Sequence, residues 1–153
     1  MQFKSITTLI LAAQALASQT RYQFFAKSES SQIDGHGLTF IHEGAAIDYL
    51  FVHKDSSTSP ATITYDDAQQ EFFSQITPQL KLNLTRGGNI LQLSPGTSLK
   101  ASIGDNGIVS FQGGDALHAV TQPNIPNAGD DYIVIVGDSE GGIPFSIVAR
   151  KSQ

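Results

Sequence analysis

The chain of 153 residues contains no cysteine. Disulfides, thiolate zinc sites and cysteine nucleophiles are therefore excluded, and stability has to come from the packing of apolar side chains. Tryptophan is absent too, so no indole ring is available for stacking on a sugar. Charged residues make up only 15% of the chain, well below the usual quarter or so, whereas hydrophobic residues make up 40%. This balance indicates a buried core beneath a surface of mostly uncharged polar side chains.

Positive charge is scarce as well. The chain has 9 Lys and Arg against 14 Asp and Glu, a formal net charge of −5 at pH 7. The basic residues form no cluster, so the field of the protein repels a phosphate backbone and an anionic membrane surface. We therefore expect no nucleic-acid partner.

Long apolar runs are also missing from the chain. No stretch reaches the length that a transmembrane helix requires, so we expect no membrane span. The last residues, 145–153, end polar and basic. A lipid-anchor signal needs a hydrophobic tail there, so we expect no lipid anchor either.

The first 17 residues have the three parts of a secretory signal peptide. Lys4 supplies the positive start, residues 6–13 form an apolar stretch, and an Ala-Leu-Ala triplet ends at Ala17. The apolar stretch is too short to span a hydrocarbon core of about 30 Å. We predict a signal peptide over residues 1–17, cleavage between Ala17 and Ser18, and export of residues 18–153 as one domain.

Strand patterns dominate the exported part. Leu80–Thr85 places three leucines on one face and Lys, Asn and Thr on the other, and Tyr132–Val136 is apolar enough for a strand buried on both faces. Similar short runs cover residues 21–27, 38–42, 47–53, 61–65, 90–93, 99–103, 108–111 and 145–150. Residues 66–75 have some helical character, although Phe72-Phe73 fits the start of a strand equally well.

Turn signals separate these runs at short intervals. Asn106-Gly107 is the strongest of them, because a two-residue type I′ hairpin turn requires positive φ at both central positions. About ten short strands spaced in this way indicate a single-domain, all-β sandwich or compact barrel. A β-trefoil, built of three similar units, is the alternative that the chain length also allows, although no convincing internal repeat is visible.

Residues that could carry catalysis are few and scattered. The acidic pairs Asp66-Asp67 and Asp130-Asp131 fall where turn and capping residues are expected. Ser94 does not lie in the G-x-S-x-G pattern of a nucleophile elbow. The histidines match no common zinc-ligand spacing; they are His36, His42, His53 and His118. We expect no catalytic residue, no metal and no cofactor.

Asn83-Leu84-Thr85 is an N-glycosylation sequon. Strand alternation places Asn83 on the polar face of its run, so Asn83 is the predicted glycosylation site. The aromatic residues fall mostly at alternating strand positions, which favours a core role over sugar stacking. A lectin-like role is therefore allowed by the sequence, but no specific feature supports it.

Several segments carry a family likeness. The predicted secretion signal, residues 22–26 (YQFFA), residues 30–38 and residues 41–52, with His42-Glu43-Gly44-Ala45, resemble secreted wall proteins of ascomycete yeasts. The final stretch, residues 132–150, is similar to the end of the phiA-type fungal cell-wall proteins. The resemblance implies a non-enzymatic protein of the fungal cell wall.

We therefore expect a secreted, non-enzymatic cell-wall or surface protein with a structural or surface-modulating role. Its expected partners are wall polysaccharide or other wall proteins. The alternative is a soluble extracellular carbohydrate-binding module.

Overall fold

The computed structural model describes residues 19–114, 116–122 and 124–153. The predicted signal peptide and its cleavage site lie outside these residues. Within them the regular secondary structure is entirely β: β1 (Gln19–Lys27), β2 (Leu38–Gly44), β3 (Ile47–Val52), β4 (Thr62–Asp66), β5 (Glu71–Thr77), β6 (Leu80–Gly87), β7 (Ile90–Ser94), β8 (Ala101–Ile103), β9 (Val109–Phe111), β10 (Leu117–Thr121), β11 (Tyr132–Val136) and β12 (Ile143–Lys151).

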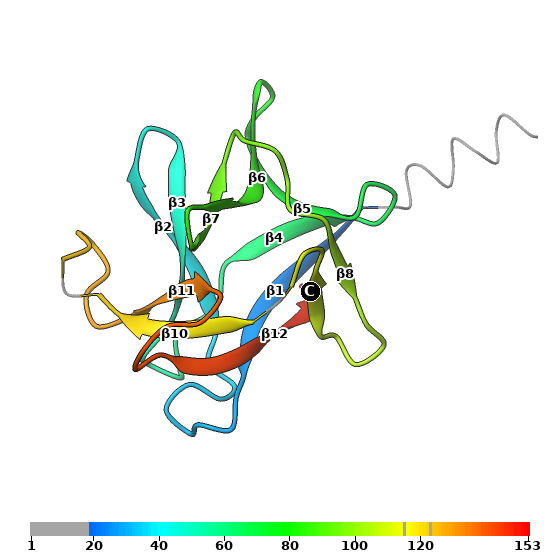
Figure 1. Ribbon diagram of the computed structural model, residues 1–153. Coiled ribbons are helices and arrows are strands. Elements are labelled where there is room, and N and C mark those ends of the chain that lie inside the picture. The colour runs from blue at the N-terminus through cyan, green and yellow to red at the C-terminus, as the bar shows by residue number, and fades with distance from the viewer. Residues whose placement is uncertain (1–18, 115, 123) are drawn as a thin grey trace, which may run out of the picture.

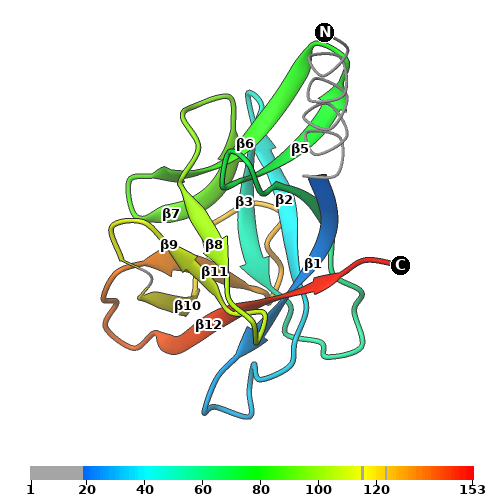
Figure 2. The ribbon, with the colours of Figure 1, turned by 90° about the vertical axis from the view of Figure 1, so that its right-hand side faces the viewer.

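The strands fall into two sets, an incompletely paired barrel wall and three hairpins. A barrel wall runs in the order β1–β4–β5–β8–β9–β12, and β12 pairs back with β1. The hairpins β2–β3, β6–β7 and β10–β11 meet one another through the pairs β3–β7, β7–β11 and β11–β3. Figure 1 shows these hairpins gathered beside the barrel strands, and Figure 2 shows the β5–β6 hairpin projecting from the body.

The strands form three consecutive units, β1–β4, β5–β8 and β9–β12, each with two barrel strands and one hairpin, which is the arrangement of a β-trefoil. Equivalent contacts relate the three units. Ala61 N donates to Leu38 O at 3.0 Å in the first unit, and Leu99 N donates to Leu84 O at 2.9 Å in the second. In the third unit the same connection is a short ladder between β10 and β12. The threefold relation thus lies in the backbone, which explains why no sequence repeat is visible.

The barrel wall has the fewest hydrogen bonds between neighbouring strands at β8 and β9. These strands form a separate two-stranded sheet, while the other strands share one curled sheet of ten. Isolated hydrogen bonds tie the small sheet to its neighbours: Ala101 N donates to Gln70 O at 2.8 Å, and Ala149 N donates to Gly107 O at 2.8 Å. This loosely tied sheet lies across β12 in Figure 2. Two surface hollows are lined in part by its residues.

Two apolar clusters hold the layers together. The main cluster fills the barrel, where the Phe72 ring meets Phe24 at 4.9 Å and Tyr65 at 4.6 Å between ring centroids. A smaller cluster lies on the other side of β11 and is covered by the loop before that strand. Val134 faces the main cluster, whereas Ile133 and Ile135 face the smaller one. The prediction that this strand is buried on both faces is confirmed.

The structure confirms the predicted all-β class and the compact sandwich or barrel, and its pairing follows the trefoil alternative. The ambiguous segment at residues 66–75 is a turn followed by strand β5. Strand β10 (Leu117–Thr121) was not predicted, because its single histidine and short length mask the alternation. Leu82 and Leu84 face the core, 3% and 0% exposed, as the alternation of β6 predicted.

The turn chemistry differs from the prediction at one hairpin. The β8–β9 connection is a four-residue turn in which Gly107 N donates to Gly104 O at 2.9 Å, and of the Asn106-Gly107 pair only Gly107 has positive φ, +83°. The predicted two-residue type I′ turn is therefore wrong here. Instead, Ala45 and Ala46 connect β2 to β3 with φ of +40° and +62°, the signature of that turn type.

Candidate functional site

The candidate site is a shallow groove on the outer face of the β8–β9 sheet. It consists of two adjoining hollows of about 310 Å³ and 360 Å³ that share Gln70 and Ser102. The first lies along both strands. The second continues from β8 past the β4–β5 turn toward β1 and β4. Each is at the small end of the range for ligand sites. We call the two hollows together, with all the residues that line either of them, the β8–β9 groove.

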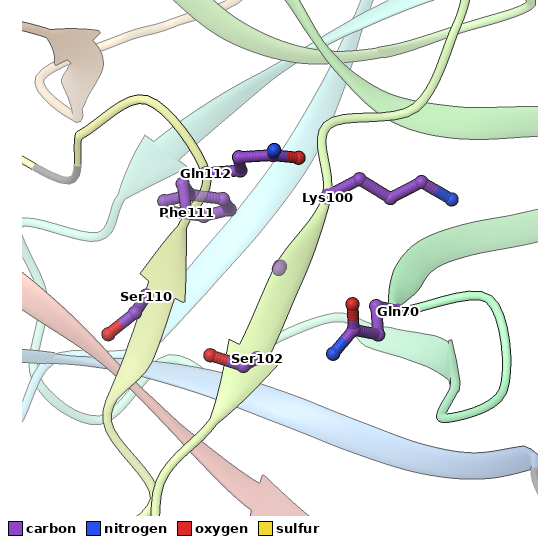
Figure 3. A pocket seen from close by; sticks show the side chains of 7 residues that line it. Gln70, Lys100, Ser102, Ser110, Phe111 and Gln112 are labelled. Carbon is purple, nitrogen blue, oxygen red and sulfur yellow. The ribbon is translucent and has the colours of Figure 1, made fainter.

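Strand alternation places the polar lining of the groove. Ser102 and Ser110 are register partners on β8 and β9, so their hydroxyls stand side by side on the outer face. The residues between them in the alternation, Ala101, Val109 and Phe111, turn inward and are buried. Figure 3 shows the hydroxyls together with the side chains of Gln70, Lys100 and Gln112 around one hollow.

The cationic group at the rim is already partnered. Lys100 Nζ donates to Gln69 O at 2.7 Å and lies 3.9 Å from a carboxylate oxygen of Glu71. Glu71 also bonds Lys81 at 3.0 Å. The first hollow therefore carries little free charge, and its remaining polar side chains are amides and hydroxyls.

The inner end of the groove is formed by two tyrosines. Tyr65 is buried and donates its hydroxyl to Ala101 O at 2.8 Å, which fixes the start of β8 against β4. Burial raises the pKa of the Tyr65 hydroxyl above its ordinary value, and the nearby carboxylate of Asp67 adds to the rise. Tyr22 packs edge-on against Tyr65, with 6.3 Å between centroids, and is half-buried in the second hollow.

Gln70 is the strained residue of this groove. It ends the β4–β5 turn with a φ of +54°, the left-handed region that a residue with a Cβ rarely adopts. Its carbonyl accepts the hydrogen bond from Ala101 N, and this bond between the β4–β5 turn and β8 helps to hold Gln70 in its left-handed conformation. Its side chain is exposed over Ser102. Strained residues of this kind cluster at functional sites.

The histidines all make hydrogen bonds through Nδ1. His36 bonds His53 O at 2.7 Å, His53 bonds an Asp131 carboxylate oxygen at 3.1 Å, and His118 bonds Gly137 O at 2.6 Å. His42 lies 2.9 Å from Asp48 on the surface. The residues that the structure describes contain no group of three His, Asp or Glu arranged to hold a metal ion.

Asp66, Asp131 and Ser94 take structural roles. Asp66 accepts a bond from Gln69 N at 3.0 Å and caps the β4–β5 turn, as predicted. Asp131 instead accepts from Lys54 N at 2.9 Å as well as binding His53, and so ties β3 to the loop before β11. The Ser94 hydroxyl is buried and lies 2.8 Å from that of Thr85.

Asn83 lies in the middle of β6, half-buried on the face opposite Leu82 and Leu84. Its Nδ2 donates to Gly96 O at 2.9 Å, and its Oδ1 is buried without a partner among the described residues. An N-linked glycan leaves one hydrogen on Nδ2, so the bond to Gly96 is compatible with the modified side chain. Glycosylation of Asn83 stays a prediction.

The aromatic rings lie mostly in the core. Within residues 19–114, 116–122 and 124–153, the buried rings are Phe24, Phe51, Phe72, Phe73, Phe111, Phe145 and Tyr65. The one large apolar side chain fully on the surface of this part is aliphatic, Ile76, which is 51% exposed. Among the described residues, no fully exposed aromatic ring is therefore present on which a sugar could stack. Half-buried rings such as Tyr22 are the aromatic surfaces that a sugar could contact.

The sequence offered little to locate the groove. Its lining mixes ordinary polar and apolar residues that come from β1, β4, the β4–β5 turn and the β8–β9 sheet. The alternation of Ser102 with Ala101 and of Ser110 with Phe111 was the single available signal. The strain at Gln70 has no sequence signature.

Fold and groove together define a disulfide-free β-trefoil domain with a shallow polar surface site. Three curated proteins of Candida albicans are similar to it over nearly the whole chain: Cell wall protein RHD3 at 34% identity over 98% of this chain, Cell wall protein PGA30 at 33% over 97%, and Cell wall protein PGA31 at 30% over 98%. The match spans 74% of RHD3 and about half of the other two, 54% and 53%. No family model and no solved structure matches the chain.

The chain therefore belongs to a family of fungal cell-wall proteins, as the resemblance implied. It is secreted to the wall or the extracellular space. In the described part of the chain, no helix is long and apolar enough to cross a membrane.

Proposed function

We propose that the protein is a non-enzymatic structural component of the fungal cell wall. The supporting observation is the match to wall proteins along nearly the whole chain, which covers every strand of the domain. The placement of Ser94 supports the proposal further, because its hydroxyl is buried against that of Thr85 and opens on no cleft that the structure describes. The His53–Asp131 pair joins the end of β3 to the loop before β11.

Fractionation of the wall tests the location and mode of attachment. We expect a tagged full-length chain in the medium, in the hot-detergent extract of the wall or in the glucanase extract. Recovery exclusively inside the cell would refute the proposal. A soluble cytosolic protein followed in parallel controls for lysis.

Incubation with wall polymers tests the non-enzymatic part. The purified protein is mixed with β-glucan, chitin and mannan, and released reducing ends are measured over time. We expect no release above that of heat-denatured protein. Steady release that a His53→Ala variant lacks would overturn the proposal and make the His53–Asp131 pair catalytic.

A carbohydrate-binding module is the second candidate, and the β8–β9 groove is the observation that favours it. Its lining of amides and paired hydroxyls fits a neutral sugar. A glycan array without binding would count against this candidate and leave the structural proposal intact.

A further inference from the structure

We propose that the β8–β9 groove binds a segment of neutral wall polysaccharide, with Gln70, Ser102 and Ser110 as its hydrogen-bonding residues. The proposal rests on the wall function given above and adds a site and a ligand class to it. Four observations support it: the shape of the groove, its donor and acceptor set, its charge and its strain.

The shape suits a chain rather than a compact cofactor. The two hollows adjoin at Gln70 and Ser102, and both open to the surface rather than into an enclosed cavity. A polymer can therefore lie across β8–β9 and pass on toward β1 without a free end entering a closed cavity. The half-buried ring of Tyr22 offers an apolar surface for one sugar face at the second hollow.

The lining supplies donors and acceptors together. The amides of Gln70 and Gln112 each carry two donor hydrogens and an acceptor oxygen, and the hydroxyls of Ser102 and Ser110 do both. Sugar hydroxyls have the same dual character, so neighbouring hydroxyls of a ring match an amide or a serine pair. The register of β8 and β9 holds the two serines side by side.

The charge favours a neutral ligand. Lys100 is the cation of the first hollow, and it is bound to Gln69 O and close to Glu71. Asp67 is the carboxylate of the second hollow. A polyanion would meet a protein of net negative charge and a lysine that is already partnered, and a polycation would meet a single carboxylate.

The backbone strain at Gln70 is the fourth observation. A glycine at this position would adopt φ +54° freely, whereas glutamine adopts it at a cost to stability. The side chain held there lines both hollows. The chain thus retains an amide at the junction of the groove at the expense of stability, which is expected where the amide contacts a ligand.

The test uses the full mature chain and three probes: insoluble (1→3)-β-glucan particles, chitin particles and soluble mannan. Binding is measured by sedimentation with the particles and by affinity electrophoresis in mannan. We expect saturable binding to at least one probe, and the pattern among the three identifies the polymer. An absence of binding to all three overturns the proposal.

Two variants locate the site. Gln70→Gly removes the amide and relieves the strain, so we expect a higher midpoint of thermal unfolding together with about five- to tenfold weaker binding, the equivalent of one or two neutral hydrogen bonds. The Ser102→Ala/Ser110→Ala double variant should weaken binding to a similar degree. Unchanged binding in both variants would overturn the proposal.

Ala46→Gly is the matched control, because Ala46 has the same left-handed conformation at a hairpin tip outside the groove lining. We expect it to leave binding unchanged, and its effect on the unfolding midpoint to be the sum of relieved strain and of the loss of a methyl group that packs against the main cluster. An equal loss of binding in Ala46→Gly would show that stiffness rather than the groove governs binding. Wall localisation of the unsubstituted chain separates the two proposals: a wall-located chain that binds no probe refutes the groove alone, and an intracellular chain refutes the wall function.

Discussion

At the scale of single residues, backbone strain is concentrated where a side chain replaces the glycine that the conformation prefers. Ala45 and Ala46 form the β2–β3 turn with φ of +40° and +62°, where type I′ turns usually have Asn and Gly. The Ala45→Asn/Ala46→Gly variant should therefore be more stable by about 1 kcal/mol, because the left-handed cost of two alanines is relieved. Chemical denaturation measures the change. A decrease in stability would mean that the turn is not of this type.

Tyr65 makes stability depend on pH at the alkaline end. Its folded-state pKa is raised above the ordinary tyrosine pKa of 10.0 by burial and by Asp67, so the unfolded chain loses this proton first as pH rises. Stability from this group is complete below pH 10.0 and is lost as pH rises toward the higher folded value. Tyr65→Phe should abolish that alkaline slope. It should also cost about 1 kcal/mol at neutral pH, since Ala101 O loses its donor.

At the scale of elements, strand β6 tests the predicted faces. Leu82 is buried in the main cluster, so Leu82→Ala should cost about 2–5 kcal/mol through the cavity that it leaves. Lys81 bonds Glu71 and lies 4.3 Å from the Phe73 ring centroid, but its side chain is 39% exposed, so Lys81→Ala should cost less than about 1 kcal/mol. Thermal and urea unfolding measure both. The reverse order would mean that the faces are inverted.

The β8–β9 turn tests the seam of the barrel. A Cβ on Gly107 would lie 2.9 Å from Ala149 O, in addition to the strain of φ +83°. A Cβ on Gly113, with φ +94°, would meet nothing within 4 Å. Gly113→Ala should therefore cost about 1–2 kcal/mol from φ alone. Gly107→Ala should cost at least about 1 kcal/mol more, because the backbone has to shift. Equal losses of stability in the two variants, measured by chemical denaturation, would mean that the contact between the β8–β9 turn and β12 can widen at no cost in free energy.

Most strands could be predicted from the sequence, and each segment that was ambiguous or wrongly predicted has an identifiable cause. Alternation in Leu80–Thr85 and the apolar run at Tyr132–Val136 located strands and faces correctly. Residues 66–75 were ambiguous because one helical turn and the start of a strand share the same pattern. The Asn106-Gly107 turn was predicted as the wrong type, since the register of β8 against β9 lengthens the loop, and register is not encoded in the pair itself.

At the scale of the whole molecule, export is the property that the structure does not address and that the sequence predicts most sharply. Protein collected from the medium or wall should begin at Ser18, within about two residues, because the small residues at −3 and −1 direct the signal peptidase. N-terminal sequencing of the secreted chain measures this. A start at Met1 would refute the signal peptide, and replacing Ala15 and Ala17 by bulky residues should block processing.

The sequence alone determined what depends on neighbours along the chain: the all-β class, the buried faces of strands such as β6, the absence of thiol chemistry and the predicted export signal. Only the tertiary structure decided the closure of three units into a trefoil and the groove that joins Gln70 to Ser102. Those features depend on which distant strands pair and in which register. The strain at Gln70 belongs to this second kind, because the bond between its carbonyl and Ala101 N exists only once the barrel has closed.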